Sequence, residues 1–269
     1  MDINLIHQGN NYKINSKDVF DISIPVDFNG KQPNFFNVDK STIKPLKTKD
    51  KYWSVSEGAS CNVYTISMNI HCSGTHTETV GHLLKNLGDI GNLLKKPFMP
   101  AILITVKLKN FGSCDDSYHC KVANDEKIIS HDEIVHQYKK YMKYKPEVLV
   151  VRTTPNRKIK KYLNYKKDIP PFFSNDAISY IRKMKIKHLI VDIPSVDRAS
   201  DNGILGNHRI FWNNNNNLKS EINPNSKNTI TEMAYIPNNI KNGMYFINLQ
   251  IPHFKSDAAP SRPLLYKIL

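Results

Sequence analysis

Alternating apolar and polar positions predict β-strands along much of this chain. The most regular alternation covers residues 61–72, CNVYTISMNIHC, where every second residue from Tyr64 to Ile70 is apolar. We expect this strand to bury that apolar face. The segment 18–28, DVFDISIPVDF, also alternates and ends before an Asn-Gly pair, which predicts a strand followed by a turn. Four further β-rich runs occupy residues 101–108, 147–153, 188–193 and 244–251.

Two segments have the pattern of helices. Residues 130–143 begin with Ser130 and Glu133 in the spacing of a capping box, and residues 174–185 begin with Ser174, a favourable N-cap. The middle of the chain therefore runs strand, helix, strand, helix, strand. That order predicts a mixed α/β fold with a large sheet, in one domain formed by all 269 residues.

Composition changes this picture little. Residues 213–228, NNNNNLKSEINPNSKN, are polar and of low complexity, which predicts a surface insertion loop. The net charge of +14 comes almost entirely from lysines spread along the whole chain, whereas arginine, which makes most base-specific contacts, is scarce. We therefore do not expect nucleic acid as a partner, although the basic stretch 156–168 could bind an acidic one.

The cellular setting follows from what the sequence does not contain. The first ten residues, MDINLIHQGN, lack the basic and apolar regions of a signal peptide, and no apolar run approaches the ~20 residues of a membrane span. Four cysteines at irregular spacings do not indicate a disulfide framework in a chain of this length. We therefore expect a cytoplasmic protein that has no membrane partner.

Residues 71–82, HCSGTHTETVGH, are the densest group of side chains that bind metals or transfer protons. In an extended backbone, Cys72, His76 and Glu78 project to the same side. Thiolate, imidazole and carboxylate are the groups that bind zinc in proteins. His82 follows a glycine that permits a sharp turn, so it could reach the same cavity. The residues alone leave two interpretations open, a metal site and a polar loop rich in His and Thr.

The segment GTHTETVGH (74–82) resembles the H-x-G-T-H-x-D-x-P-x-H signature of the kynurenine formamidase/putative cyclase family. Other segments resemble further motifs of that family, in the same order, over about residues 18–267. They are DISIPV (21–26), VDIPSVDR (191–198), GNHRIF (206–211), TEMAYIP (231–237) and IPHFKSDAAPSRPLL (251–265). Each match is short, but their shared order makes the set specific.

This resemblance implies a single compact domain of β-sheets, partly barrel-like, flanked by helices and holding two divalent metal ions. By position, His76 would bind the first metal and Glu78 would bridge the two. His208 and Glu232 would complete the second metal's ligands, and His82 would be the catalytic acid/base. The resemblance also implies a homodimer or a higher homo-oligomer.

The chain departs from the family signature at the first ligand position, where Cys72 replaces His. A β-bulge at Ser73-Gly74 would bring His71 onto the metal face instead. A neutral ligand suits a site that already holds two carboxylates, which favours His71, but the sequence leaves both residues as candidates. Thiolate would favour zinc, whereas His71 allows zinc or manganese, and we expect zinc first. Glu78 replaces the usual Asp and can still bridge.

Glu221 competes with Glu232 for the second metal. The spacing of Glu221 from His208 is closer to the family's, but Glu221 falls in the Asn-rich insertion. Glu232 is followed by Met-Ala-Tyr-Ile-Pro and later by Gly243, as the family's glutamate is followed by its own downstream residues. We therefore predict Glu232.

Together these residues predict a metal-dependent hydrolase that cleaves a C–N amide bond with metal-activated water and His82 as acid/base. The resemblance implies an aryl formamide such as N-formylkynurenine, from tryptophan catabolism, or a related cyclic or aryl amide. Phe35 and Phe36 lie near the family's substrate-stacking Trp and could sandwich a planar substrate. Ser195 and Asp197 are expected to shape the surrounding loop. The alternative is a family member that has lost catalysis and serves as a binding or structural protein.

Overall fold

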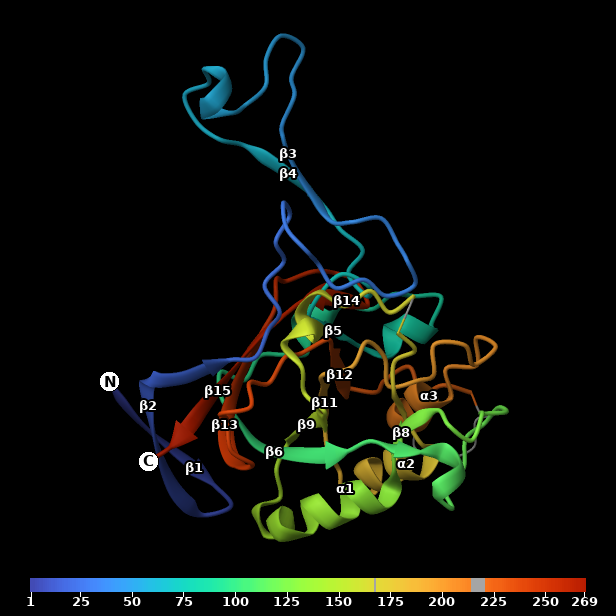
Figure 1. The fold of residues 1–269 in the computed structure, drawn as a ribbon. Helices are drawn as coiled ribbons and strands as arrows, with labels where there is room; N and C mark the ends of the chain where they lie inside the picture. The colour runs from blue at the N-terminus through green and yellow to red at the C-terminus, as the bar shows by residue number, and fades with distance from the viewer. Residues whose placement is uncertain (167, 214–220) are drawn as a thin grey trace.

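A ten-stranded mixed sheet runs through the body of the molecule (Figure 1). The computed structural model describes residues 1–166, 168–213 and 221–269. In order across the sheet, the strands are β1 (Asp2–His7), β2 (Asn10–Asp21), β15 (Arg262–Ile268), β13 (Gly243–Gln250), β6 (Met99–Lys107), β9 (Val148–Thr154), β11 (His188–Val191), β12 (Thr229–Glu232), β5 (His76–Glu78) and β14 (Ala258–Pro260).

Strands β6, β9, β11 and β12 are parallel to one another, and the strands outside them pair antiparallel. Parallel neighbours need crossover connections, which contain the helices α1 (His131–Tyr138), α2 (Asn175–Lys183) and α3 (Gly206–Trp212). The mixed α/β fold predicted from the sequence is therefore confirmed. The four β-rich runs form β6, β9, β11 and β13, and the two predicted helices are α1 and α2.

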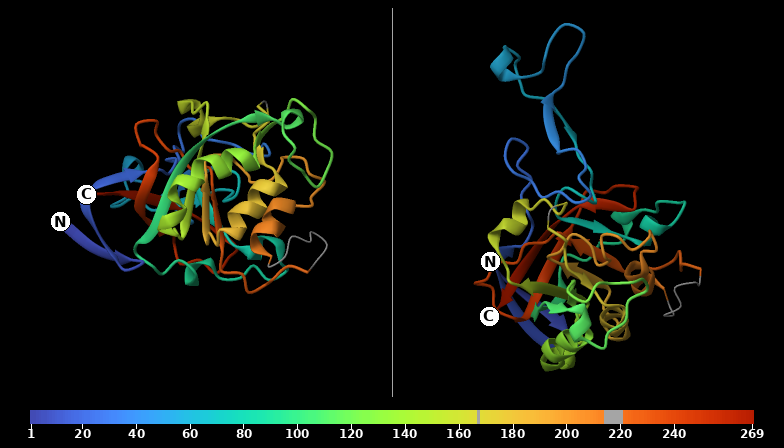
Figure 2. Two further views of the ribbon diagram at one scale, coloured as in Figure 1. Left: turned by 90° about the horizontal axis from the view of Figure 1, so that it is seen from below. Right: turned by 45° about the vertical axis from the view of Figure 1, so that its right-hand side comes forward.

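The two faces of the central strands build separate apolar cores because side chains alternate along a strand. Ile102 and Ile104 of β6 pack with Ile178 of α2 and Phe211 of α3 on the helical face. Leu103 of β6 lies in the core on the opposite face. The helices gather on one side of the sheet, as Figure 2 shows from below. This arrangement leaves the edge at β12, β5 and β14 to carry the polar site described below.

The predicted helix starts are confirmed, with the Glu133 carboxylate bonded to the backbone N–H of Lys107. The hydroxyl of Ser130 accepts the backbone N–H of Glu133, and the hydroxyl of Ser174 accepts that of Ala177 at 3.1 Å. Each bond satisfies a backbone donor that the first turn of the helix leaves without a partner. Helix α1 ends at Tyr138, and a 3-10 segment (Lys139–Tyr144) continues it past the end of the predicted range, 130–143.

The prediction of a buried strand over residues 61–72 is wrong. Only Tyr64–Ser67 forms a strand, β4, and all four of its residues are exposed. It pairs with β3 (Thr42–Pro45) in a two-stranded ribbon that stands away from the body in Figure 1 and in the right-hand view of Figure 2. The alternation is real, but nothing in the described part of the chain covers its apolar face. We refer to residues 42–70 as the arm.

The strand predicted at 18–28 also differs from the structure. It starts earlier, as β2, and ends at Asp21, after which irregular backbone carries Ile22 and Ile24 into the core. The predicted turn is held by Asp27, whose carboxylate accepts the backbone N–H groups of Asn29 and Gly30.

A third, small sheet contains β10 (Phe172–Phe173), β8 (Lys127–Ile129) and β7 (Lys109–Asn110).

Part of the predicted insertion loop, residues 214–220, lies outside the described residues. Within the described ranges, no helix is long and apolar enough to cross a membrane.

The burial of His188 makes the free energy of unfolding depend on pH. Burial lowers the pKa of His188 from 6.5 to about 4, and its Nδ1 lies 2.8 Å from the hydroxyl of Thr229. The unfolded chain therefore takes up a proton before the folded one as the pH falls. The stabilisation is complete above pH 6.5 and disappears between pH 6.5 and 4, where we expect a loss of roughly 3 kcal/mol. Urea unfolding at pH 7 and pH 4 measures this loss. A His188→Gln variant should lack it, and an unchanged pH dependence in that variant would contradict the assignment.

Candidate metal centre

The register between β5 and β12 brings three ionisable side chains together. His76 and Glu78 lie two residues apart on β5 and therefore point to the same side. Glu232, the last residue of β12, is the direct cross-strand partner of His76, and His76 Nε2 lies 3.6 Å from Glu232 Oε2. All three residues are buried. The sequence could not specify this pairing, because β12 and β5 are about 150 residues apart.

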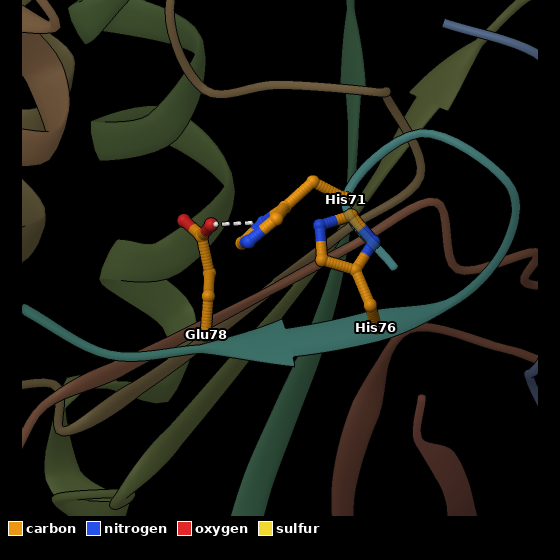
Figure 3. A group of neighbouring side chains, drawn as sticks. All are labelled: His71, His76 and Glu78. Carbon is orange, nitrogen blue, oxygen red and sulfur yellow. Dashed lines mark hydrogen bonds and ion pairs between the residues drawn. The ribbon is translucent and has the colours of Figure 1, made fainter. Parts of the chain in front are cut away.

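His71 joins this cluster and Cys72 does not. His71 Nδ1 lies 3.1 Å from Glu78 Oε2, and its ring stands beside that of His76 (Figure 3). Cys72 packs instead in an apolar cluster with Phe35 and Ile24, where burial raises the pKa of its thiol to about 11. Both residues lie in turns and bends between β4 and β5. The alternation expected of a strand, and the bulge proposed to correct it, therefore do not apply here.

His208 approaches the same carboxylates from helix α3. Its Nε2 lies 2.8 Å from Glu78 Oε1 and 3.6 Å from Glu232 Oε1, and its Nδ1 contacts Asp197 at 2.7 Å. Burial lowers the pKa of His208, but the charges of Glu78 and Asp197 outweigh burial and raise it well above its ordinary value. Burial raises the pKa of Glu78, and His208 in turn holds it well below its usual range.

Asp197 fixes the position of His208. It accepts the backbone N–H groups of Asn207 and His208 as well as the imidazole Nδ1–H, and the Tyr118 hydroxyl donates to it at 2.9 Å. Ser195 lies in the same loop and accepts the backbone N–H of Asp197. Both residues thus support the site, as the sequence led us to expect.

His82 lies at the edge of the cluster, in the 3-10 turn Val80–Leu83 that follows β5. Its side chain is 27% exposed, and its Nδ1 is 3.3 Å from Asp257 Oδ2 but 4.0 Å from Glu78 Oε2. The turn needs glycine at position 81, because a Cβ there would overlap the backbone oxygen of Leu87. His71, which is 28% exposed, and His82 are therefore the two accessible imidazoles beside Glu78, and His82 is the more distant of the two.

Asp257 is the residue that the sequence analysis did not single out. It lies immediately before β14, which pairs with β5, and its Oδ2 contacts both His71 Nε2 at 3.0 Å and His82 Nδ1. Burial raises the pKa of Asp257, but these two imidazoles outweigh burial and lower it. Burial lowers the pKa of His71, and Asp257 and Glu78 together raise it to about 10. In the sequence, the only signal for Asp257 was its position in the C-terminal motif at 251–265.

The donor set fits divalent metal. His76 Nδ1 is hydrogen-bonded to the Gly74 carbonyl, so this nitrogen carries the proton, and His76 Nε2 is buried without a hydrogen-bond partner among the described residues. A nitrogen lone pair thus faces the Glu232 carboxylate at 3.6 Å, which is unfavourable unless a cation lies between them. Ligands of a metal at about 2.1 Å lie roughly 3.0–3.4 Å apart, close to the spacings found here.

Two groups of three potential ligands share Glu78. His71, His76 and Glu78 form one group, and Glu78, His208 and Glu232 form the other, with ligand atoms in each within 4.8 Å of one another. Glu221, the rival of Glu232, is exposed and belongs to neither group. The structure therefore brings together every ligand expected from the sequence except Cys72.

A cavity of about 550 Å³ opens over the cluster. Phe35 and Phe36 line it, with ring centroids 3.9 Å apart, and Cys72, Ser195 and Arg198 also reach it. Phe35 is buried, whereas Phe36 is 63% exposed and adopts a left-handed backbone (φ 59°), which is uncommon for a residue with a bulky side chain. The two rings give one wall of the cavity an aromatic surface.

Comparison with known proteins identifies the family to which this chain belongs. The family model "Putative cyclase" matches residues 20–198, which is more than half of the chain. The chain therefore belongs to this family. Kynurenine formamidase of Bacillus cereus is 25% identical over 162 residues, which cover 59% of this chain and 64% of that relative. This chain thus matches less than two thirds of the relative's length.

Solved structures show the same fold. A structure described as a potential metal-dependent hydrolase with cyclase activity superposes with a TM-score of 0.60, at 17% identity, over 92% of this chain and 96% of the other. Isatin hydrolase A from Labrenzia aggregata also gives a TM-score of 0.60, at 14% identity, over 92% of this chain and 93% of the other.

Proposed function

We propose that this protein is a hydrolase that cleaves a C–N amide bond with divalent metal held by His71, His76, Glu78, His208 and Glu232. The observation that carries the proposal is the pair of ligand groups that share Glu78, with His76 Nε2 left unpaired and facing a carboxylate. A shared carboxylate between two sets of imidazole and carboxylate ligands suits two ions, either zinc or manganese. Cys72 is left out because it belongs to neither of the two ligand groups.

The residues divide the remaining work. Metal in this centre would act as a Lewis acid towards the amide carbonyl and make water acidic enough to react near neutral pH. Asp257 engages His82 Nδ1, so His82 Nε2 is the ring nitrogen left to exchange a proton with a molecule in the cavity. His82 takes a proton from the attacking water and delivers it to the departing nitrogen as the C–N bond breaks. Asp257 keeps the imidazole in the orientation and tautomer that this requires.

The substrate we propose is an aryl amide, either an aryl formamide such as N-formylkynurenine or a cyclic amide such as isatin. The aromatic wall of Phe35 and Phe36 supports a planar substrate, because rings stack and exclude water on that side of the cavity. The Bacillus cereus relative is a kynurenine formamidase, and one structural neighbour is an isatin hydrolase. Their names suggest the two compounds to assay first.

Metal analysis of the purified full-length chain tests this proposal. We expect up to two equivalents of zinc or manganese, and we expect reloading of the chelated protein to restore hydrolysis of one aryl amide. Metal that binds only the folded state should also stabilise it by about 2.7 kcal/mol at a concentration 100 times the dissociation constant. Elemental analysis, thermal melting and an absorbance assay measure the three effects. Protein that holds no metal and melts at one temperature with or without it would end the proposal.

A further inference from the structure

One wall of the cavity over the metal centre is a loop, residues 199–205, that leads into helix α3. Apart from Ile204, every residue of this loop lines the cavity. Its backbone is left-handed at Asn202 (φ 62°), Gly203 (φ 70°) and Leu205 (φ 52°). A leucine in this region is strained, so the surrounding contacts must hold the loop in its shape. We refer to residues 199–205 as the wall loop.

The carboxylate of Asp201 holds this backbone in place. Its Oδ1 accepts the backbone N–H of Gly203 at 3.0 Å, and its Oδ2 accepts that of Leu205 at 2.6 Å. The same Oδ2 lies 3.2 Å from His119 Nε2, and the two side chains are only 6% and 2% exposed. A buried carboxylate is costly unless its hydrogen bonds are made. The shape of the wall loop therefore depends on how Asp201 is held.

His119 is fixed in one orientation and one tautomer. The side-chain amide of Asn175, in helix α2, donates to His119 Nδ1 at 3.2 Å. Nδ1 therefore carries no proton, and the Nε2–H donates to Asp201. The ring packs against Gly206, the first residue of α3, where a Cβ would overlap the imidazole. His119 thus links α2 to the wall loop, and Gly206 leaves room for its ring there.

The contacts of Asp201 are separate from those of the candidate metal ligands. Asp197, which precedes the wall loop, orients the ligand His208. Among the described residues, the Asp201 carboxylate bonds only to His119 and to the backbone of the wall loop. A change at His119 should therefore alter the wall loop and leave the ligands in place.

We propose that His119 is a positioning residue that sets the affinity of the cavity for substrate, because through Asp201 it holds the wall loop in the shape that the substrate contacts. This inference rests on the proposed function, which supplies the substrate. The wall loop contains neither His82 nor a member of the two ligand groups that share Glu78. Its contacts therefore contribute equally to the bound substrate and to the transition state. Loss of such contacts raises KM and leaves kcat unchanged.

Steady-state kinetics of zinc-loaded, full-length His119→Leu tests the proposal, with N-formylkynurenine and isatin as the two probes. Leucine fills the buried site but cannot donate a hydrogen bond to Asp201. Since a hydrogen bond to a charged group is lost, we expect KM to rise about tenfold while kcat changes less than about twofold.

Two further variants show whether the hydrogen bond is responsible. The amide of His119→Gln reaches the position of Nε2 and can donate to Asp201, so this variant should keep most of the affinity. His131→Gln makes the same change in a histidine that is paired with Asp132 at 3.3 Å and does not line the cavity, so it should leave KM unchanged.

Hydrogen exchange in peptides that cover residues 199–206 reports on the wall loop without any substrate. We expect faster exchange in His119→Leu than in the unaltered chain, with equal metal content in both. If circular dichroism shows that His119→Leu is unfolded, Asp201→Asn takes its place, because it removes the charge at nearly constant size. If the unaltered chain hydrolyses neither compound, the proposed function fails, and exchange alone decides whether His119 holds the loop.

Three results would overturn the proposal. Exchange that stays the same in folded His119→Leu would show that the wall loop does not depend on His119. An unchanged KM, in a chain that hydrolyses either probe, would show that the shape of the loop does not set the affinity. Loss of metal, or a fall in kcat at constant KM, would place the effect of His119 on the metal centre instead.

Discussion

Replacing Glu78 by Gln is expected to abolish metal binding at both ligand groups and hydrolysis with it. Glu78 is the one residue common to the two groups, and it is buried between His71 and His208. The amide keeps the size of the side chain but removes the negative charge that a divalent ion needs. Changes to residues that only support a ligand already cost 10–100-fold in affinity, so we expect a loss of at least roughly 100-fold here. Elemental analysis after dialysis, together with the hydrolysis assay, measures the effect.

Two further variants make this result specific. Glu78→Asp shortens the side chain by one methylene to the carboxylate that the family signature carries, so we expect it to retain metal. Glu57→Gln makes the same chemical change at an exposed position of the arm and should alter neither metal content nor rate. Glu78→Gln protein that keeps its full metal content would show that the two ligand groups do not depend on a shared carboxylate.

Local patterns were sufficient for most of the central fold. The caps at Ser130 and Ser174 and the β-rich runs that became β6 and β9 depend on neighbours in sequence, so the sequence alone specifies them. Helix α3 was missed, because it has only seven residues and six of them are buried. A short helix that is buried nearly all round shows no polar face, and its periodicity cannot be detected.

The arm shows the limit of alternation as a signal. The regular pattern from Tyr64 to Ile70 correctly indicates extended backbone near β4, but it carries no information about what covers the apolar side. The prediction of burial failed because no other segment in the described part of the chain packs against that side.

The sequence predicted the candidate site residues that fall in ordered family motifs. It did not predict the contacts that depend on which strands pair. His76, Glu78 and His208 were identified by their motifs, and Glu232 was preferred to Glu221 by the residues that follow it. The contact between His71 and Asp257 joins residues 186 positions apart and depends on the pairing of β14 with β5. No local feature of Asp257 indicates such a contact, because a long-range register is set by the folded sheet as a whole.

Replacing His82 by Ala is expected to lower the rate of amide hydrolysis by about 10²–10⁴ while metal content stays the same. His82 belongs to neither of the two ligand groups that share Glu78. His82 contacts Asp257 at 3.3 Å, stands 4.0 Å from Glu78, and is partly exposed to the cavity, whereas His76 and His208 are buried against carboxylates. Loss of its imidazole removes the group that transfers the proton and leaves the carboxylates and imidazoles that hold metal in place. Steady-state kinetics and elemental analysis of the same preparation separate the two effects.

His136→Ala is the matched control, because His136 is an exposed histidine of helix α1 outside the cavity. It should leave both rate and metal content unchanged. A His82→Ala protein that loses its metal would make His82 a ligand, and the division of work between His71 and His82 around Asp257 would then be wrong. Full activity in a metal-loaded His82→Ala protein would mean that another group transfers the proton. In that case Asp257 would not act through His82, and its contact with His71 would give it a role only in positioning a metal ligand.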